Sequence, residues 1–203
     1  MYYVSRFFEH AGLSPARRDA KSCVSTTRKF IRPTKSDRTL GRQWLKQAGL
    51  DLPGKLAVLH PGSGGRHKCW HIENFANMAE RLRRTGFEVL FLLGPAEMER
   101  LSDTDMRRLH DAATCVGDLA LPQVVAILCC AVAFVGNDSG VTHLAAGMGL
   151  PTVALFGPTD PAQYAPLGPA LKVIHDPHPG FSAEPSSERV QTVAETIAAL
   201  MNS

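Results

Sequence analysis

The strongest chemical signal is the run 136–140, Gly-Asn-Asp-Ser-Gly, which stands between an apolar strand-like segment and an apolar helix-like segment. Asn, Asp, Ser and Gly are typical of turns and helix N-caps. The free N–H groups of a first helical turn, together with the helix dipole, form a site for an anion. The pattern therefore predicts an anion site that includes Asp138, Ser139 and Gly140. His143 lies one helical turn after Ser139 and can point to the same side. The alternative is a plain N-cap with a core histidine.

A second loop, residues 60–70, has the composition of a phosphate-binding turn. Glycines such as Gly64 let backbone N–H groups approach an anion closely, and Lys68 adds a positive charge. Ser63 lies in the same loop. His67 stands where a Walker A loop or a dinucleotide fingerprint needs its last glycine, so neither motif is present. A turn without a ligand remains the alternative.

Two further loops follow expected strands. In residues 94–99, Glu97 or Glu99 could accept hydrogen bonds from ribose hydroxyls, or could complement the positive end of the next helix. In residues 156–161, Thr159 and Asp160 could bind a sugar or cap a turn. Each role stays open for these side chains.

Other kinds of catalytic site are disfavoured. The run 136–140 is not the G-x-S-x-G of a serine hydrolase, and Asp138 and His143 have no evident third metal ligand. No metal and no cofactor are therefore expected. The five cysteines match no zinc spacing; Cys69 is expected to be a neighbour of the chemistry, and Cys129 and Cys130 are expected in an apolar helix.

Alternating strands and helices must position these loops. This alternation predicts an α/β fold, a Rossmann-like parallel sheet with helices on both faces, with ligands bound beyond the carboxyl ends of the strands. Strands are expected at 56–60, 88–93, 114–116, 133–136, 152–156 and 171–174. Helices are expected at 4–13, 38–48, 72–85, 97–110, 121–130, 139–148 and in a C-terminal segment around 190–200.

The chain divides into a basic N-terminal segment and linker, 1–54, and a Rossmann-like domain, 55–203. Residues 1–50 hold eleven Lys or Arg against three Asp or Glu, a net charge of +8 in a chain of +3. The segment could contact an anionic membrane or a phosphorylated acceptor, or be a solvated linker. The basic residues lack the repeated aromatic interleaving of a single-strand nucleic-acid platform, so nucleic acid is not an expected partner. No signal peptide is evident, and a cytoplasmic location is expected.

Together the loops resemble glycosyltransferase family 9, the ADP-heptose:lipopolysaccharide heptosyltransferases. The resemblance covers about residues 55–175 and depends on the order and spacing of four motifs. These are His60-Pro61-Gly62-Ser63 with Lys68-Cys69-Trp70, Gly94-Pro95-Ala96-Glu97, Gly136-Asn137-Asp138-Ser139-Gly140 with His143-Leu144-Ala145-Ala146, and Phe156-Gly157-Pro158-Thr159-Asp160-Pro161. The stretch 2–12 also resembles the end of the family's N-terminal domain. His71 departs from the proline that the family often has after the tryptophan.

The resemblance implies the C-terminal, donor-binding domain of a GT-B enzyme that inverts the sugar without a metal. Ser63, Gly64 and Lys68 would contact the donor phosphates, and Ser139, Gly140 and His143 would meet the diphosphate. Glu97 would hold the ribose and Asp138 would reach the transferred sugar. The donor would be a nucleotide-diphosphate sugar such as ADP-heptose, and the acceptor the lipopolysaccharide core.

Fewer than sixty residues precede the first expected strand, which leaves no room for the family's acceptor domain and its general base. We therefore expect the donor-binding half of a transferase. The alternative is a non-catalytic binding fragment or pseudo-enzyme with a basic tail for a membrane or a partner.

Overall fold

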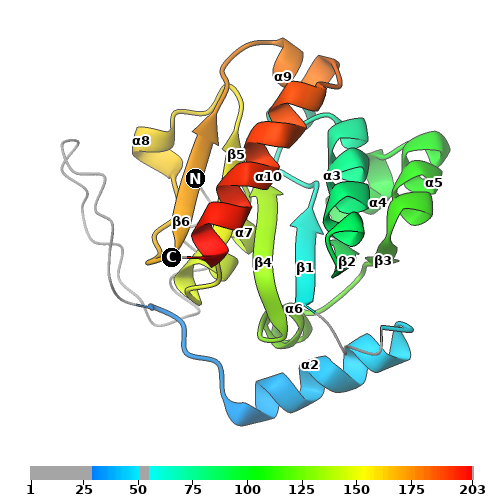
Figure 1. Cartoon of the computed structure of the whole chain (residues 1–203), viewed down its shortest axis with the longest axis vertical. Helices are drawn as coiled ribbons and strands as arrows, with labels where there is room; N and C mark the ends of the chain where they lie inside the picture. The colour runs from blue at the N-terminus through cyan, green and yellow to red at the C-terminus, as the bar shows by residue number, and fades with distance from the viewer. Residues whose placement is uncertain (1–28, 51–54, 203) are drawn as a thin grey trace.

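The computed structural model describes residues 29–50 and 55–202, and its centre is a six-stranded parallel sheet (Figure 1). The strand order is β3-β2-β1-β4-β5-β6, and every neighbouring pair is parallel. The strands are β1 Lys55–His60, β2 Phe87–Leu92, β3 Thr114–Val116, β4 Ala131–Asn137, β5 Thr152–Phe156 and β6 Leu171–His175. The expected Rossmann-like α/β fold is confirmed.

Helices bury both faces of the sheet. The apolar faces of α3, α5 and α10 form one core with the strands, and α2, α6 and α7 contribute to a second core on the opposite face. These helices are α2 Lys35–Gln47, α3 Ile72–Arg84, α5 Asp103–Ala112, α6 Leu121–Leu128, α7 Gly140–Gly147 and α10 Ser187–Met201. Shorter elements are η1 Arg66–Lys68, α4 Pro95–Arg100, α8 Pro161–Tyr164 and α9 Gly180–Ala183.

The expected helix 97–110 is wrong, because the chain forms two helices here. Leu101 is extended, and Ser102 begins α5 as an N-cap whose hydroxyl accepts a hydrogen bond from the N–H of Asp105. The Asp105 carboxylate in turn accepts from the Ser102 N–H, which completes a capping box. This start signal separates α5 from α4.

Smaller differences occur at other helix ends. Helix α6 ends at Leu128, so Cys129 is its C-cap and Cys130 follows it, rather than both lying within the helix as expected. Helix α2 begins at Lys35, because Thr34 and Asp37 form a capping box. The short α8 and α9 were not expected. The expected helix 4–13 and the resemblance at 2–12 lie outside the described residues.

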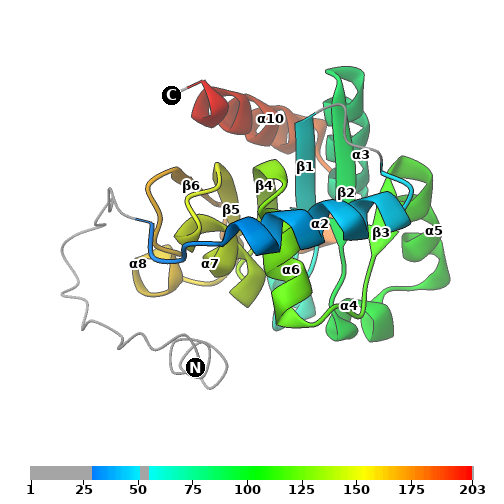
Figure 2. The ribbon, with the colours of Figure 1, turned by 90° about the horizontal axis from the view of Figure 1, so that it is seen from below.

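Helix α2 lies across the amino ends of the strands and packs against α6 (Figures 1 and 2). Leu45 is buried in the shared core, and Gly41 sits so close to α6 that a Cβ there would lie 2.0 Å from the carbonyl oxygen of Ala126. The helix therefore packs as part of the folded unit. The division of the chain at residue 54 stays a prediction.

Candidate functional site

Asn137 joins the glycine-rich loop to the end of β4. Its side chain is fully buried, its Nδ2 donates to the Pro61 carbonyl at 2.7 Å, and its Oδ1 accepts from the Trp70 N–H at 2.9 Å. Pro61 and Trp70 flank the loop 62–69, so one amide side chain holds both of its ends. Because β1 and β4 are neighbouring parallel strands, their following loops meet at one edge of the sheet.

Asp138 meets the same loop through two contacts. Its carbonyl accepts a hydrogen bond of 2.7 Å from the Ser63 hydroxyl, and its carboxylate Oδ2 lies 3.6 Å from the Lys68 ammonium. Both charged side chains are partly exposed, at 32% for Lys68 and 13% for Asp138. The structure therefore brings together three of the residues that the sequence singled out, with opposite charges in contact and open to solvent.

Ser139 is the N-cap of α7, as one of the two sequence interpretations proposed. Its hydroxyl accepts from the Thr142 N–H at 3.3 Å, while the Thr142 hydroxyl donates to the Asn137 carbonyl at 2.6 Å. The N–H groups at the start of α7, beginning with Gly140, have no carbonyl of a preceding turn to bond. Gly140 is exposed, with open space where a Cβ would project, and His143 is half-buried one turn later.

The buried Glu97 carboxylate lies directly against the glycine-rich loop. A Cβ on Gly62 would lie 2.2 Å from Glu97 Oε1, so only glycine allows this approach. The other carboxylate oxygen, Oε2, accepts from the Gly94 N–H at 2.7 Å and so stabilises the start of α4. Glu99 is exposed. Glu97 is thus the acid that adjoins the loop, and its capping role at α4 is observed.

Comparison with known proteins identifies the family that contains these loops. Residues 24–192 match the family described as glycosyltransferase family 9 (heptosyltransferase). The chain belongs to glycosyltransferase family 9. It is 31% identical over 150 residues to lipooligosaccharide heptosyltransferase 2 of Haemophilus influenzae, a match that covers 71% of this chain and 43% of that protein. It is 28% identical over 120 residues to lipopolysaccharide heptosyltransferase 3 of Escherichia coli, covering 58% of this chain and 35% of that protein.

Solved structures of the family share the fold. ADP-heptose lipopolysaccharide heptosyltransferase II of Escherichia coli superposes with a TM-score of 0.67 at 23% identity, over 85% of this chain and 53% of that one. The Escherichia coli heptosyltransferase WaaC, solved with ADP, has a TM-score of 0.60 at 25% identity, over 74% of this chain and 48% of that one. This family 9 chain therefore spans about half the length of these solved relatives and less of the curated ones.

Arg100 and Cys69 also adjoin the loop of this family 9 chain. An Arg100 guanidinium N–H donates to the Ser63 carbonyl at 3.5 Å. Sequence reasoning missed Arg100, although its place one helical turn after Glu97 was a usable signal. Burial, aided by the Glu97 carboxylate, raises the pKa of the Cys69 thiol to about 11. Cys69 therefore stays a neutral thiol beside the site, in line with its expected role as a neighbour.

In the loop 156–161, the two candidate residues Thr159 and Asp160 differ in what they bond. Asp160 is the N-cap of α8, where its carboxylate accepts from the Ala162 N–H at 2.9 Å. The Thr159 hydroxyl is shielded from solvent and has no hydrogen-bond partner within the described residues. Capping is thus observed for Asp160, whereas sugar contact by either residue stays a prediction.

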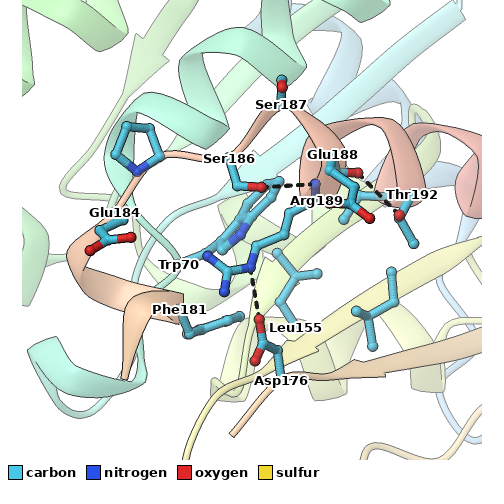
Figure 3. A pocket seen from close by; sticks show the side chains of 13 residues that line it. Trp70, Leu155, Asp176, Phe181, Glu184, Ser186, Ser187, Glu188, Arg189 and Thr192 are labelled. Carbon is cyan, nitrogen blue, oxygen red and sulfur yellow. Dashed lines mark hydrogen bonds and ion pairs between the residues drawn. The ribbon is translucent and has the colours of Figure 1, made fainter. Parts of the chain in front are cut away.

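A hollow of about 650 Å³ lies beside the candidate site, between the end of β6 and the start of α10 (Figure 3). Its Arg189 forms an ion pair of 2.7 Å with Asp176 and donates to the Gly180 carbonyl at 2.9 Å. The next residue, Phe181, accepts the His71 N–H at 3.2 Å through its carbonyl. Arg189 and Asp176 therefore hold α9 against the segment that follows Lys68. Sequence reasoning missed both residues, which carry no motif.

The described residues contain no group of three or more His, Cys, Asp or Glu side chains that could hold a metal ion. Within the same parts of the chain, no helix is long and apolar enough to cross a membrane.

His60, at the end of β1, should make stability depend on pH. It is buried, its Nδ1–H donates to the Leu92 carbonyl at 2.7 Å, and burial lowers its pKa below the ordinary 6.5. The His60 imidazole binds a proton more tightly in the unfolded state than in the folded state. The free energy of unfolding that depends on a neutral His60 is therefore fully present above pH 6.5 and is lost as the pH falls below that value. Binding of this one proton lowers the free energy of unfolding by at most about 1.4 kcal/mol for each pH unit of acidification.

Urea unfolding between about pH 7.5 and about pH 5.5 measures this effect, since the window brackets the ordinary histidine pKa. His60→Asn, which keeps a donor for Leu92, should show a shallower loss of unfolding free energy than the parent. The exposed His110→Asn is the matched control and should keep the parental slope. Equal slopes in all three proteins would show that His60 is not the group that titrates.

Proposed function

We propose that this chain binds the nucleotide-diphosphate part of a sugar donor and is the donor half of a transferase that glycosylates the lipopolysaccharide core. The observation that carries the proposal is the meeting of Lys68, the loop glycines and the start of α7 around Asp138. An ammonium and free backbone N–H groups at one place suit a diphosphate. Membership of family 9, and the ADP in the related WaaC, favour ADP-heptose as the donor.

In the proposed reaction an acceptor hydroxyl attacks the anomeric carbon from the face opposite the diphosphate. The bond from that carbon to the phosphate oxygen breaks, the bonding pair leaves with the nucleoside diphosphate, and the configuration inverts. The acceptor's proton goes to a general base expected in an acceptor domain. Negative charge thus grows on the diphosphate, where Lys68 and the N–H groups at Ser139 and Gly140 would stabilise it.

Within this proposal the remaining candidates have separate roles. Ser63, Gly64 and His143 would contact the phosphates, Glu97 would accept from the ribose hydroxyls, and Asp138 would reach the transferred sugar. For Glu97, ribose binding would use the carboxylate oxygen that does not cap α4. The reaction would take place in the cytoplasm, where a peripheral position at the inner membrane would bring it near its acceptor.

Two glycine substitutions test whether a ligand approaches the backbone. A Cβ at Gly64 or at Gly140 would meet no atom within 4 Å, and neither residue has a positive φ. Gly140→Ala should therefore keep or raise stability, by up to about 1 kcal/mol for an alanine in a helix. Both variants should bind ADP about tenfold or more weakly, because a methyl group would stand between phosphate and N–H.

Calorimetry with ADP and urea unfolding on each variant check this expectation. Unchanged ADP affinity in two stably folded variants would contradict a diphosphate at these N–H groups.

The alternative is a non-catalytic nucleotide-sugar-binding fragment or pseudo-enzyme. It predicts ADP binding without sugar transfer even when an acceptor domain from a family 9 relative is supplied. Transfer under those conditions would contradict it.

A further inference from the structure

A second hollow lies at the opposite edge of the sheet from the donor loops. At this edge α2 crosses the amino ends of the strands (Figure 2). Its volume is about 1270 Å³, and we call it the basic groove. Its cationic wall is formed by Lys29, Arg32, Lys35, Arg38 and Arg42, and its apolar wall includes Leu128, Val132 and Met148.

Within residues 29–50 and 55–202, no acidic side chain pairs with the cations of the basic groove. All five cations are exposed, and within the described chain none of them forms an ion pair. The acid on this part of α2, Asp37, is held by the Thr34 N–H and hydroxyl at 2.7 and 2.8 Å. The capping box thus occupies the one nearby carboxylate of α2 and leaves the cations to solvent.

Exposed apolar side chains lie in the segments that form the basic groove. Phe30, Leu40 and Val132 are 39%, 38% and 36% exposed, which makes them half of the six large apolar side chains that are exposed in the described chain. Phe30 adjoins Lys29 in the chain, and Val132 lines the groove. Leu40 is two residues from both Arg38 and Arg42, so it lies on a different side of α2 from these two cations. Exposed apolar groups interspersed with cations suit the boundary between lipid headgroups and acyl chains. A polyanion without an apolar phase would use only the cations.

We propose that the basic groove is a docking surface for a bilayer that contains anionic phospholipids. The cations would lie among the headgroup phosphates, with Phe30 and Val132 inserted beside them. Since this surface lies at the amino edge of the sheet and the donor loops at the carboxyl edge, the two sites would act independently. The proposal does not rest on the function proposed for the donor loops.

Vesicle sedimentation of the full chain tests the docking surface. The parent should sediment with vesicles of phosphatidylglycerol and phosphatidylcholine but not with phosphatidylcholine alone, and added salt should weaken binding. Arg38→Gln with Arg42→Gln should lower the partition coefficient by about thirtyfold, because two cations would no longer attract the anionic headgroups. The matched control, Arg81→Gln with Arg84→Gln, removes two exposed cations from α3 and should keep parental binding.

Each other outcome overturns the proposal. Equal losses in the two double variants would show a general charge effect, and no loss in the groove variant would assign binding to other residues. No preference for phosphatidylglycerol would exclude an anionic bilayer. Val132→Ser, at an exposed residue that lines the groove, should weaken vesicle binding while leaving any binding to polyuridylate unchanged. The reverse result would assign the groove to nucleic acid. Saturating ADP should not alter vesicle binding, so this result is independent of the donor site.

Discussion

Lys68→Ala should weaken the binding of ADP, or of an ADP-sugar, by about tenfold or more, which is about 1.4 kcal/mol. The ammonium is partly exposed and lies 3.6 Å from the Asp138 carboxylate. Its removal deletes a charged interaction with phosphate and also leaves Asp138 uncompensated beside the bound anion. Because the side chain is at the surface, the fold should remain intact. Isothermal titration calorimetry gives the affinity, and urea unfolding gives the stability.

Two variants show whether the effect belongs to this site. Lys172→Ala removes an exposed lysine near the amino end of β6 and should bind ADP as the parent does. Lys68→Ala combined with Asp138→Asn should recover part of the ADP affinity, because the repelling carboxylate is gone. Parental affinity in Lys68→Ala would remove Lys68 from the diphosphate site. A decrease in ADP affinity of equal size in Lys172→Ala would show that the effect comes from the net charge of the protein and not from the site.

Asn137→Ala should destabilise the fold by about 2–6 kcal/mol and also loosen the donor loop. The side chain is fully buried and bonds the Pro61 carbonyl and the Trp70 N–H. Its removal leaves two backbone groups without a partner, at about 1–3 kcal/mol for each unsatisfied buried group. With both ends of the loop 62–69 released, Lys68 would no longer be held near Asp138, so ADP affinity should fall as well.

Urea unfolding and ADP titration of the same preparation separate the two effects. Asn202→Ala, at the exposed C-cap of α10, is the control and should change stability by no more than about 0.5 kcal/mol. A decrease in stability without a change in ADP affinity would mean that the loop keeps its position without Asn137. A decrease in affinity at parental stability would mean that the buried bonds do not stabilise the fold.

The sequence by itself determined the fold class and the family, and it singled out loops that the structure brings together at one edge of the sheet. Strand and helix periodicity comes from residues adjacent in the chain, and turn residues such as those in 136–140 act locally. The same local chemistry contained the signal that was overlooked at Ser102 and Asp105, whose capping box divides one expected helix into two.

Only the tertiary structure decided which candidates meet and what they already bond. Asn137 bonds the Pro61 carbonyl, Lys68 contacts Asp138, and Glu97 lies against Gly62. Each of these contacts joins residues far apart in the chain. No local pattern specifies such contacts, because they depend on which strands become neighbours in the sheet. The basic groove also depends on the tertiary structure. Its cations form one wall of a hollow only because α2 packs across the amino ends of the strands.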